Sequence, residues 1–432
     1  MEQQIAPMEM EAPLGAKGPG RSTPRALRAA VPLTVTALLA FAYLFTVVYG
    51  NENDMATVQA QLAQTQTALA SVQAQMAQLS SDGSTVTAPL RRVPAEWEPQ
   101  RAVWLQWPRH WEYDGNVGIY TAFENIITAI ALYEDVHLIW HQENEGLPNW
   151  PAQSNPETGA NFDQATLDRI TFHSSGGAGG ADTDGHPLGA SNGAWATDNS
   201  WMRDNGPLYV VENGELTVQN WEFDAWGGGF GPLPYSNDNG IPGTVAMYAG
   251  LPVHHIPIVH EKGDLECNGI DSCVVSWSVL SQRNPQTSKS DTTDQLKEAL
   301  GVQSIIYIEG FEEIDGTRGH VDGMVRFVGP NTLLVGQDGG ELLDNVAAMI
   351  AEQRPDLTID RMVAESAELF MNFLVGNGFI ILGDSGDSAQ NIYAQEKLQT
   401  HYPDRNVHFV DVSELWVNGG GIHCVTNDQP LL

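Results

Sequence analysis

The 432-residue chain has few cysteines and few basic side chains, and each shortage excludes a class of protein. Its three cysteines, Cys267, Cys273 and Cys424, show no C-x-x-C spacing, so a zinc site of four thiolates is excluded. Lysines and arginines number 20 against 54 aspartates and glutamates, which gives a net charge of −34. Nucleic acid is therefore not expected as a partner, because phosphate binding needs clustered Lys and Arg.

Nucleotide-binding motifs are also missing. No G-x-G-x-x-G follows a predicted strand and no G-x-x-x-x-G-K-[ST] occurs, so nothing indicates a nucleotide site. The acidic excess has two interpretations: solubility in a salty habitat, or attraction of a cationic ligand. The candidate site residues have to decide between them.

The N-terminal part differs from the rest. Residues 1–28 are predicted to be a disordered cytoplasmic tail, and residues 29–50 carry no charge and are long enough to cross a bilayer as a helix. Basic residues precede this segment and Glu52 and Asp54 follow it, so we expect a signal anchor with the rest of the chain periplasmic or at the cell surface. A cleaved signal peptide is the alternative.

Residues 51–81 form a predicted stalk. Its seam positions from Val58 to Leu79 are spaced alternately by four and three residues, as in the a and d positions of a coiled coil. We expect homo-oligomer formation through residues 55–79, and a lone helical spacer is the alternative. Residues 82–91 are a linker by composition.

Residues 92–432 alternate short apolar runs with helical patterns. Strands are predicted at 137–140, 208–211, 304–308, 332–336, 378–382 and 407–412, and helices at 120–133, 293–301, 343–353 and 387–403. The alternation predicts an α/β domain.

Two stretches in this domain carry candidate acid–base groups. His320 and Asp322 lie in GTRGHVDGMVRFVG, and on a strand their spacing would project both side chains from one face. A surface pair at a strand end is the alternative. Asp204 lies in TDNSWMRDNGP, and a half-buried carboxylate there needs a partner, either Arg203 or a cationic ligand.

Cys424 follows three glycines, which leave room for a substrate beside the sulfur. A nucleophilic thiol is favoured by a neighbouring imidazolium, and His320 is the candidate, since His423 would point away on a strand. A packed core cysteine is the alternative. Together, two carboxylates suit a planar guanidinium, a thiol suits attack on its central carbon, and a histidine suits proton transfer.

Residues 94–430 resemble the agmatine deiminase and bacterial peptidylarginine deiminase family of the guanidino-group-modifying (pentein) superfamily. The resemblance lies in PAEWEPQRAVWLQWP, TDNSWMRDNGP, GHVDGMVRF, MNFLVGNG and GGGIHC, in this order. It implies that residues 92–432 are a deiminase catalytic domain with the fold of a five-bladed α/β propeller of ββαβ repeats. It also implies that no metal or organic cofactor is needed.

The resemblance assigns roles to matching residues. Cys424 corresponds to the nucleophile that forms a covalent amidino intermediate, and His320 to the general acid and base. Asp204 and Asp322 correspond to the guanidinium clamps, and Asn372 to an asparagine beside the cysteine.

Three further residues follow from the same comparison. Trp97 and Glu98, in the first motif, are expected to line the substrate entrance. Lys262, in EKGDLECNG, stands where the family has a glycine, which puts the substrate preference in doubt.

The activity implied is the hydrolysis of agmatine to N-carbamoylputrescine and ammonia, a step of putrescine biosynthesis. Deimination of arginine in peptides or proteins is the alternative, so the expected partner is a cationic guanidino compound or an arginine-containing peptide. An amidinotransferase and an inactive membrane-tethered scaffold are weaker alternatives. Cys267 and Cys273 flank a hairpin signal, NGIDS, and are either a disulfide or two free thiols.

Overall fold

The computed structural model describes residues 90–432 except 110–111, 114–115, 142–161, 176–194, 196 and 311–315. The chain divides into two compact units, and the described residues belong to the second, residues 87–432. The predicted tail, the anchor at 29–50, the stalk at 51–81 and nearly all of the linker lie outside the described residues. Among the helices that are described, none has the length and apolar character needed to cross a bilayer.

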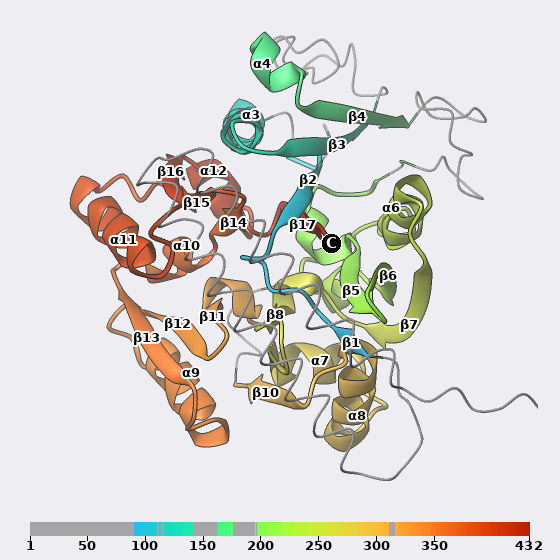
Figure 1. Ribbon diagram of the computed structural model, residues 1–432, viewed down its shortest axis with the longest axis vertical. Coiled ribbons are helices and arrows are strands. Elements are labelled where there is room, and N and C mark those ends of the chain that lie inside the picture. The colour runs from blue at the N-terminus through green and yellow to red at the C-terminus, as the bar shows by residue number, and fades with distance from the viewer. Residues whose placement is uncertain are drawn as a thin grey trace, which may run out of the picture. The chain divides into compact units, whose positions relative to one another are not determined.

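The described residues form five sheets that share one plan, and Figure 1 shows them following one another around the molecule. In one sheet, β5 (Leu208–Glu212) and β6 (Glu215–Glu222) are antiparallel, and β7 (Val253–Val259) joins β6 in parallel after α6 (Ile241–Ala249). The β5–β6 turn is Asn213-Gly214, with φ of 54° and 88°. Two positive φ angles are what a tight two-residue hairpin requires.

Three other sheets repeat this plan of an antiparallel pair, a helical crossover and a parallel strand. Their elements are β8 (Leu265–Cys267), β9 (Ser272–Ser276), α7 (Trp277–Arg283), α8 (Lys289–Leu300) and β10 (Ser304–Ile308); β11 (Val325–Gly329), β12 (Thr332–Gln337), α9 (Glu341–Gln353) and β13 (Thr358–Val363); and β14 (Leu374–Gly376), β15 (Phe379–Gly383), α11 (Ser388–His401) and β16 (Asn406–Val410). The ββαβ repeat implied by the family resemblance is therefore present in the chain.

The fifth sheet joins both ends of the domain. The C-terminal strand β17 (Thr426–Pro430) pairs antiparallel with β2 (Gln100–Gln106), and β3 (Asp135–His141) and β4 (Ile170–Ser175) follow in parallel. The crossover is α3 (Val117–Ala131), which Asn116 caps by accepting from the Gly118 N–H, and a short α4 (Gln164–Leu167) precedes β4. The two-residue strand β1 (Arg91–Arg92) pairs antiparallel with β5 and so extends the sheet of β5, β6 and β7.

The strands and helices predicted from the apolar runs and helical patterns of residues 92–432 lie within or overlap these elements, so the α/β prediction is confirmed. Helix α3 shows why, because Phe123, Ile126, Ile127 and Ile130 recur at helical spacing and are fully buried. Each such buried side chain contributes about 1.5–3 kcal/mol relative to exposure. The apolar face therefore sets both the helix and its position against the sheet.

One turn of helix leads into the first strand of most sheets. These turns are α5 (Met202–Asn205), η4 (Lys262–Asp264), η5 (Val321–Gly323) and α10 (Ala367–Met371), and the chain also turns at residues 422–425 before β17. The predicted strand at His320 and Asp322 is therefore wrong. Arg318 and Gly319 have φ of 70° and 86°, which interrupts extended backbone, and the strand begins only at Val325.

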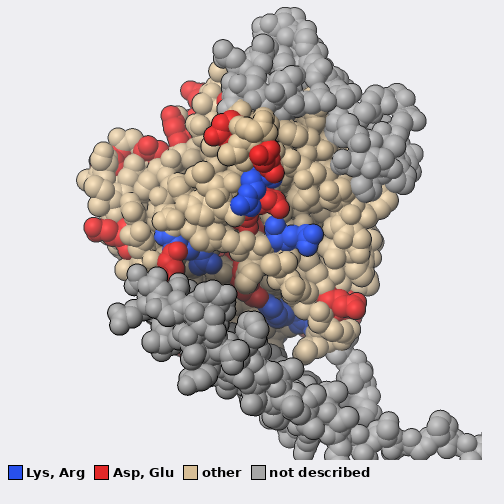
Figure 2. All heavy atoms as spheres, turned by 45° about the horizontal axis from the view of Figure 1, so that its top comes forward, with Lys and Arg blue, Asp and Glu red and all other residues tan. Residues whose placement is uncertain are grey.

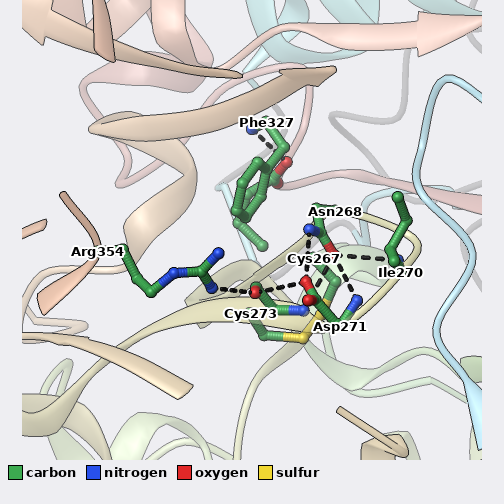
Figure 3. The surroundings of a disulfide bond; sticks show 9 residues. Cys267, Asn268, Ile270, Asp271, Cys273, Phe327 and Arg354 are labelled. Carbon is green, nitrogen blue, oxygen red and sulfur yellow. Dashed lines mark hydrogen bonds between the residues drawn. A yellow bond between two sulfur atoms is a disulfide. The ribbon is translucent and has the colours of Figure 1, made fainter. Parts of the chain in front are cut away.

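Cys267 and Cys273 form a disulfide across the β8–β9 hairpin, where the two residues lie opposite each other (Figure 3). Asn268 closes the connection, because its Oδ1 accepts from the backbone N–H groups of Ile270, Asp271 and Ser272 at 2.9–3.0 Å. The alternative of two free thiols is thus not what the structure has.

Charges of both signs are mixed on the surface. On the face drawn in Figure 2, Lys and Arg side chains lie beside Asp and Glu side chains. An example from the exposed ion pairs is Arg361 with Asp344, at 2.7 Å. Such pairs hold local geometry but contribute little to stability, typically 0–1 kcal/mol.

Candidate active site

Three of the predicted site residues meet around Gly263. A Cβ placed on Gly263 would lie 2.5 Å from Asp204 Oδ1, 2.8 Å from His320 Nδ1 and 3.4 Å from Asp322 Oδ2. The Nδ1 of His320 lies 3.6 Å from Asp204 Oδ1. Asp204 comes from α5, Gly263 from η4 and the other two from η5 and its cap, so three short turns before three different sheets build this cluster.

Cys424 joins the cluster through Asp322. Its Sγ accepts from Asn372 Nδ2 at 3.1 Å and lies 3.4 Å from Asp322 Oδ2, to which the S–H donates. A Cβ on Gly420 would lie 2.9 Å from this sulfur, so a side chain at position 420 would crowd it. Burial, followed by the charges of Asp322 and Asp204, raises the pKa of Cys424 well above its usual value, which keeps the free site in the thiol form.

His320 is held as a cation. Burial alone would lower its pKa, but Asp204, Glu261 and Asp264 outweigh burial and raise it to about 10. Its Nε2 lies 3.5 Å from Glu261 Oε2, and the same carboxylate binds Arg283 Nε at 2.7 Å. Sequence reasoning did not single out Glu261. The only signal for it was its place beside the Lys262-Gly263 departure.

Asp204 does not pair with Arg203, which was one of the two expected partners. Its Oδ2 accepts from Trp226 Nε1 at 2.8 Å and its Oδ1 from the Gly263 N–H at 3.1 Å. Burial raises the pKa of Asp204 to about 6, with His320 opposing and Asp322 and Glu261 adding to the rise. Trp226 has φ of 59°, a left-handed conformation that non-glycine residues rarely adopt and that persists only when the surroundings enforce it.

The prediction that His423 points away from Cys424 is wrong. Cys424 lies in a turn and not on a strand, so the strand alternation does not apply. The Nδ1 of His423 lies 2.8 Å from Asp322 Oδ2, the oxygen that Cys424 also contacts, and its Nε2 lies 2.8 Å from Glu96 Oε2. Glu96 was also missed, although it directly precedes Trp97 and lies in the same motif as Glu98.

Those two named residues have other contacts. Glu98 pairs with Arg92 at 2.6 Å and accepts from the Ala95 N–H, whereas Trp97 packs on core residues of the β11–β13 and β14–β16 sheets. The backbone oxygen of Trp97 accepts from Arg405 at 2.7 Å. Of this segment, Glu96 is the residue whose described contacts reach the site.

A buried charge network surrounds the cluster. Arg326 binds Glu96 at 2.8 Å and Glu266 at 3.1 Å. Arg203 and Lys262 both bind Asp428 Oδ1, at 2.7 and 2.9 Å. The lysine in place of the family glycine therefore neutralises a buried aspartate.

The geometry can be compared with known proteins. The model of the Porphyromonas-type peptidyl-arginine deiminase family matches residues 92–430. The chain belongs to this family. It is accordingly a hydrolase that acts on guanidino C–N bonds.

One sequence relative and two solved structures are similar to this chain over most of their length. A Mycoplasma capricolum protein, provisionally named an agmatine deiminase, is 27% identical over 372 residues, which is 76% of this chain and 92% of its own length. The agmatine deiminase of Enterococcus faecalis has a TM-score of 0.64 at 22% identity and matches 79% of this chain and 96% of its own. The agmatine deiminase of C. jejuni has a TM-score of 0.62 at 18% identity, with 81% and 99% covered. At these identities the structures establish the fold alone.

We expect Gly263→Ala to lower turnover of a guanidino substrate at least ~100-fold without unfolding the protein. The new methyl group would meet a carboxylate oxygen and an imidazole nitrogen at under 3 Å, so these groups must move, and small displacements of reacting groups cost about this factor. Steady-state kinetics and circular dichroism measure the two effects.

Gly323→Ala is the matched control. Gly323 follows Asp322 directly, yet a Cβ there would meet nothing within 4 Å, so turnover should stay near wild type. Equal losses in both variants would show that the spacing around Gly263 is not what matters.

Proposed function

We propose that the protein hydrolyses agmatine to N-carbamoylputrescine and ammonia through a covalent intermediate on Cys424. The observation that carries this proposal is the meeting of two carboxylates and one imidazole around Gly263, with the Cys424 sulfur 3.4 Å from one of the carboxylates. A flat cation that lies between Asp204 and Asp322 would face the thiol.

Binding and activation are coupled in this site. A guanidinium donates N–H groups to both carboxylates, which replaces the water they lose on burial. The same positive charge offsets Asp204 and Asp322, the two carboxylates that disfavour the thiolate. Substrate binding therefore lowers the pKa of Cys424 at the moment when attack is needed.

The chemistry uses one water for each ammonia released. The Cys424 S–H bond breaks, its proton passes by way of the Asp322 contact to water, and the sulfur bonds to the guanidinium carbon. The His320 imidazolium then protonates one nitrogen, which leaves as ammonia, and the neutral imidazole takes a proton from water as the hydroxide attacks the thiouronium carbon. The C–S bond breaks, the proton of the new hydroxyl group passes to the departing sulfur, and this forms the carbonyl of the carbamoyl product and restores the thiol. In this scheme Asn372 holds the sulfur during attack.

Charge around the site favours a substrate without a carboxylate. Among the described residues, three buried arginines and the half-buried Lys262 surround it, and each binds an acid of the chain: Arg203 and Lys262 bind Asp428, Arg283 binds Glu261, and Arg326 binds Glu96. A C-terminal arginine would need one of these cations to leave its partner, whereas the amine of agmatine needs none.

Trp97 and Glu98 remain the residues proposed to line the substrate entrance.

The architecture and location are part of the proposal. The five sheets are the blades of a closed propeller, residues 29–50 anchor the chain in a membrane with the catalytic domain outside the cytoplasm, and residues 55–79 mediate self-association. The Cys267–Cys273 disulfide supports export, since disulfides persist in oxidising compartments.

The full chain should release ammonia from agmatine, and Cys424→Ala should lower this by ~10⁴-fold or more, because the nucleophile is lost. Ammonia release and product mass are measured with agmatine, free arginine and an arginine-containing peptide. If the peptide yields citrulline and agmatine is not turned over, the substrate is arginine in peptides and the agmatine proposal is wrong. Equal, near-zero release by both proteins on all substrates would support an inactive scaffold.

The pH dependence follows from two groups. Asp204 must be ionised to bind a guanidinium, and its pKa is raised to about 6, so kcat/KM should fall as the pH drops below 6. His320 must be protonated to expel ammonia, and its pKa is raised to about 10, so the rate should fall as the pH rises above 10. Rates from pH 4 to 11 test this, with circular dichroism at each pH as the control. A flat profile from pH 4 to 7 would contradict the clamp.

Export predicts a thiol count. The full chain, isolated from bacteria without reductant, should expose one thiol after unfolding, because Cys267 and Cys273 are bridged and Cys424 is free. A variant that lacks residues 1–50 and stays in a reducing cytoplasm should expose three. Labelling with a thiol reagent and intact-mass measurement give both numbers, and three thiols in the full chain would refute export.

A further inference from the structure

His423 is a buried imidazole that the proposed reaction does not use, and both of its ring nitrogens face carboxylates. Nδ1 lies 2.8 Å from Asp322 Oδ2 and Nε2 lies 2.8 Å from Glu96 Oε2. A neutral imidazole has one N–H and one lone pair, so it can donate to only one of these oxygens. The second contact requires an additional proton somewhere in the three groups.

The carboxylates are poor places for that proton. Glu96 receives Arg326 at 2.8 Å and lies 3.7 Å from Arg203, and against its burial these cations and His423 hold its pKa well below the usual range. Asp322 is buried, which raises its pKa, but the hydrogen bond and charge of His423 outweigh burial and lower it. With both acids ionised, both nitrogens of His423 carry protons.

Burial and the charges of Arg203 and Arg326 oppose a cationic His423 and lower its pKa. Both arginines, however, are bound to further acids: Arg203 to Asp428 at 2.7 Å and Arg326 to Glu266 at 3.1 Å. Lys262 also binds Asp428. The network thus has four buried carboxyls (Glu96, Glu266, Asp322 and Asp428) and three Lys and Arg cations. Burial raises the pKa of Glu266 to about 7, and a charged His423 balances the network when Glu266 is ionised.

The backbone of His423 acts on the site as well. Its N–H donates to Asn372 Oδ1 at 3.0 Å, which turns the amide so that Nδ2 donates to Cys424 Sγ at 3.1 Å. One residue therefore orients both groups that contact the sulfur, the Asn372 donor and the Asp322 acceptor.

We propose that His423 is an imidazolium that acts as a positioning residue: it neutralises Asp322 and thereby makes ionisation of the neighbouring Cys424 thiol easier. Asp322 is 3.4 Å from the sulfur, so an uncompensated carboxylate there opposes a thiolate strongly. The other groups that act on the sulfur are Asp204, the backbone N–H of Gly421, Asn372 and the hydroxyl of Tyr113. For turnover the inference rests on the proposed function, but its effect on the thiol does not.

The test is the rate of alkylation of Cys424 by iodoacetamide as a function of pH, in the full chain without substrate. His423→Gln keeps a hydrogen-bonding side chain but removes the charge. We expect the kinetic pKa of the thiol to rise by at least about one unit, which is roughly a tenfold slower alkylation at neutral pH. Against a guanidino substrate, kcat should fall more than KM changes.

Glu96→Gln is the second variant, in case His423→Gln does not fold. It removes the acceptor that holds the second proton, so His423 becomes neutral and the thiol pKa should rise in the same direction. An unchanged or lower thiol pKa in Glu96→Gln would overturn the proposal.

Glu266→Gln is the matched control. Glu266 is equally buried and binds the same Arg326, together with the Phe327 N–H, but has no described contact with His423. Its alkylation profile should stay at wild type, and a shift as large as that of Glu96→Gln would assign the effect to the network in general and overturn the role of His423. A wild-type enzyme inactive on every guanidine would refute the proposed function while leaving the alkylation result valid.

Discussion

The site depends on a balance of charge in the interior of the domain. An isolated buried carboxylate costs several kcal/mol, and its partner must therefore be present and correctly placed. Glu96 illustrates the constraint, because it binds Arg326 and His423 and lies near Arg203. It thereby connects the segment that precedes β2 with β11, α5 and the turn before β17. Removing any one partner leaves a charge that the surrounding side chains cannot solvate.

Asp204 and Asp322 have no Lys or Arg among their described hydrogen-bond partners. Asp204 is bound by an indole N–H and a backbone N–H and lies 3.6 Å from an imidazole nitrogen, and Asp322 is bound by another imidazole. Such a pair favours a ligand that brings positive charge and several N–H donors in one plane.

The repeated plan of the sheets explains how residues far apart in sequence come together. Each of α5, η4, η5, α10 and the turn at 422–425 stands directly before the first strand of a sheet, and each carries or adjoins a site residue. The strands that follow these turns support them, because β8, β14 and β17 are buried along their whole length. Rigid support of this kind is what a site of several converging groups requires.

The sequence by itself determined the α/β class and the main helices and strands, because apolar periodicity is a property of neighbouring residues. Its motifs also named Cys424, His320, Asp204, Asp322 and Asn372 as candidates, and the structure brings these five residues together. Sequence reasoning misplaced His320 and Asp322 on a strand and turned His423 away, since the left-handed Arg318-Gly319 pair and the turn at Cys424 are not visible in a hydrophobic pattern. Only the tertiary structure decided that Glu96 and Glu261 belong to the site and that Lys262 binds Asp428. Those contacts join residues more than 150 positions apart or depend on which buried charge lies opposite which, and local sequence carries no information about either.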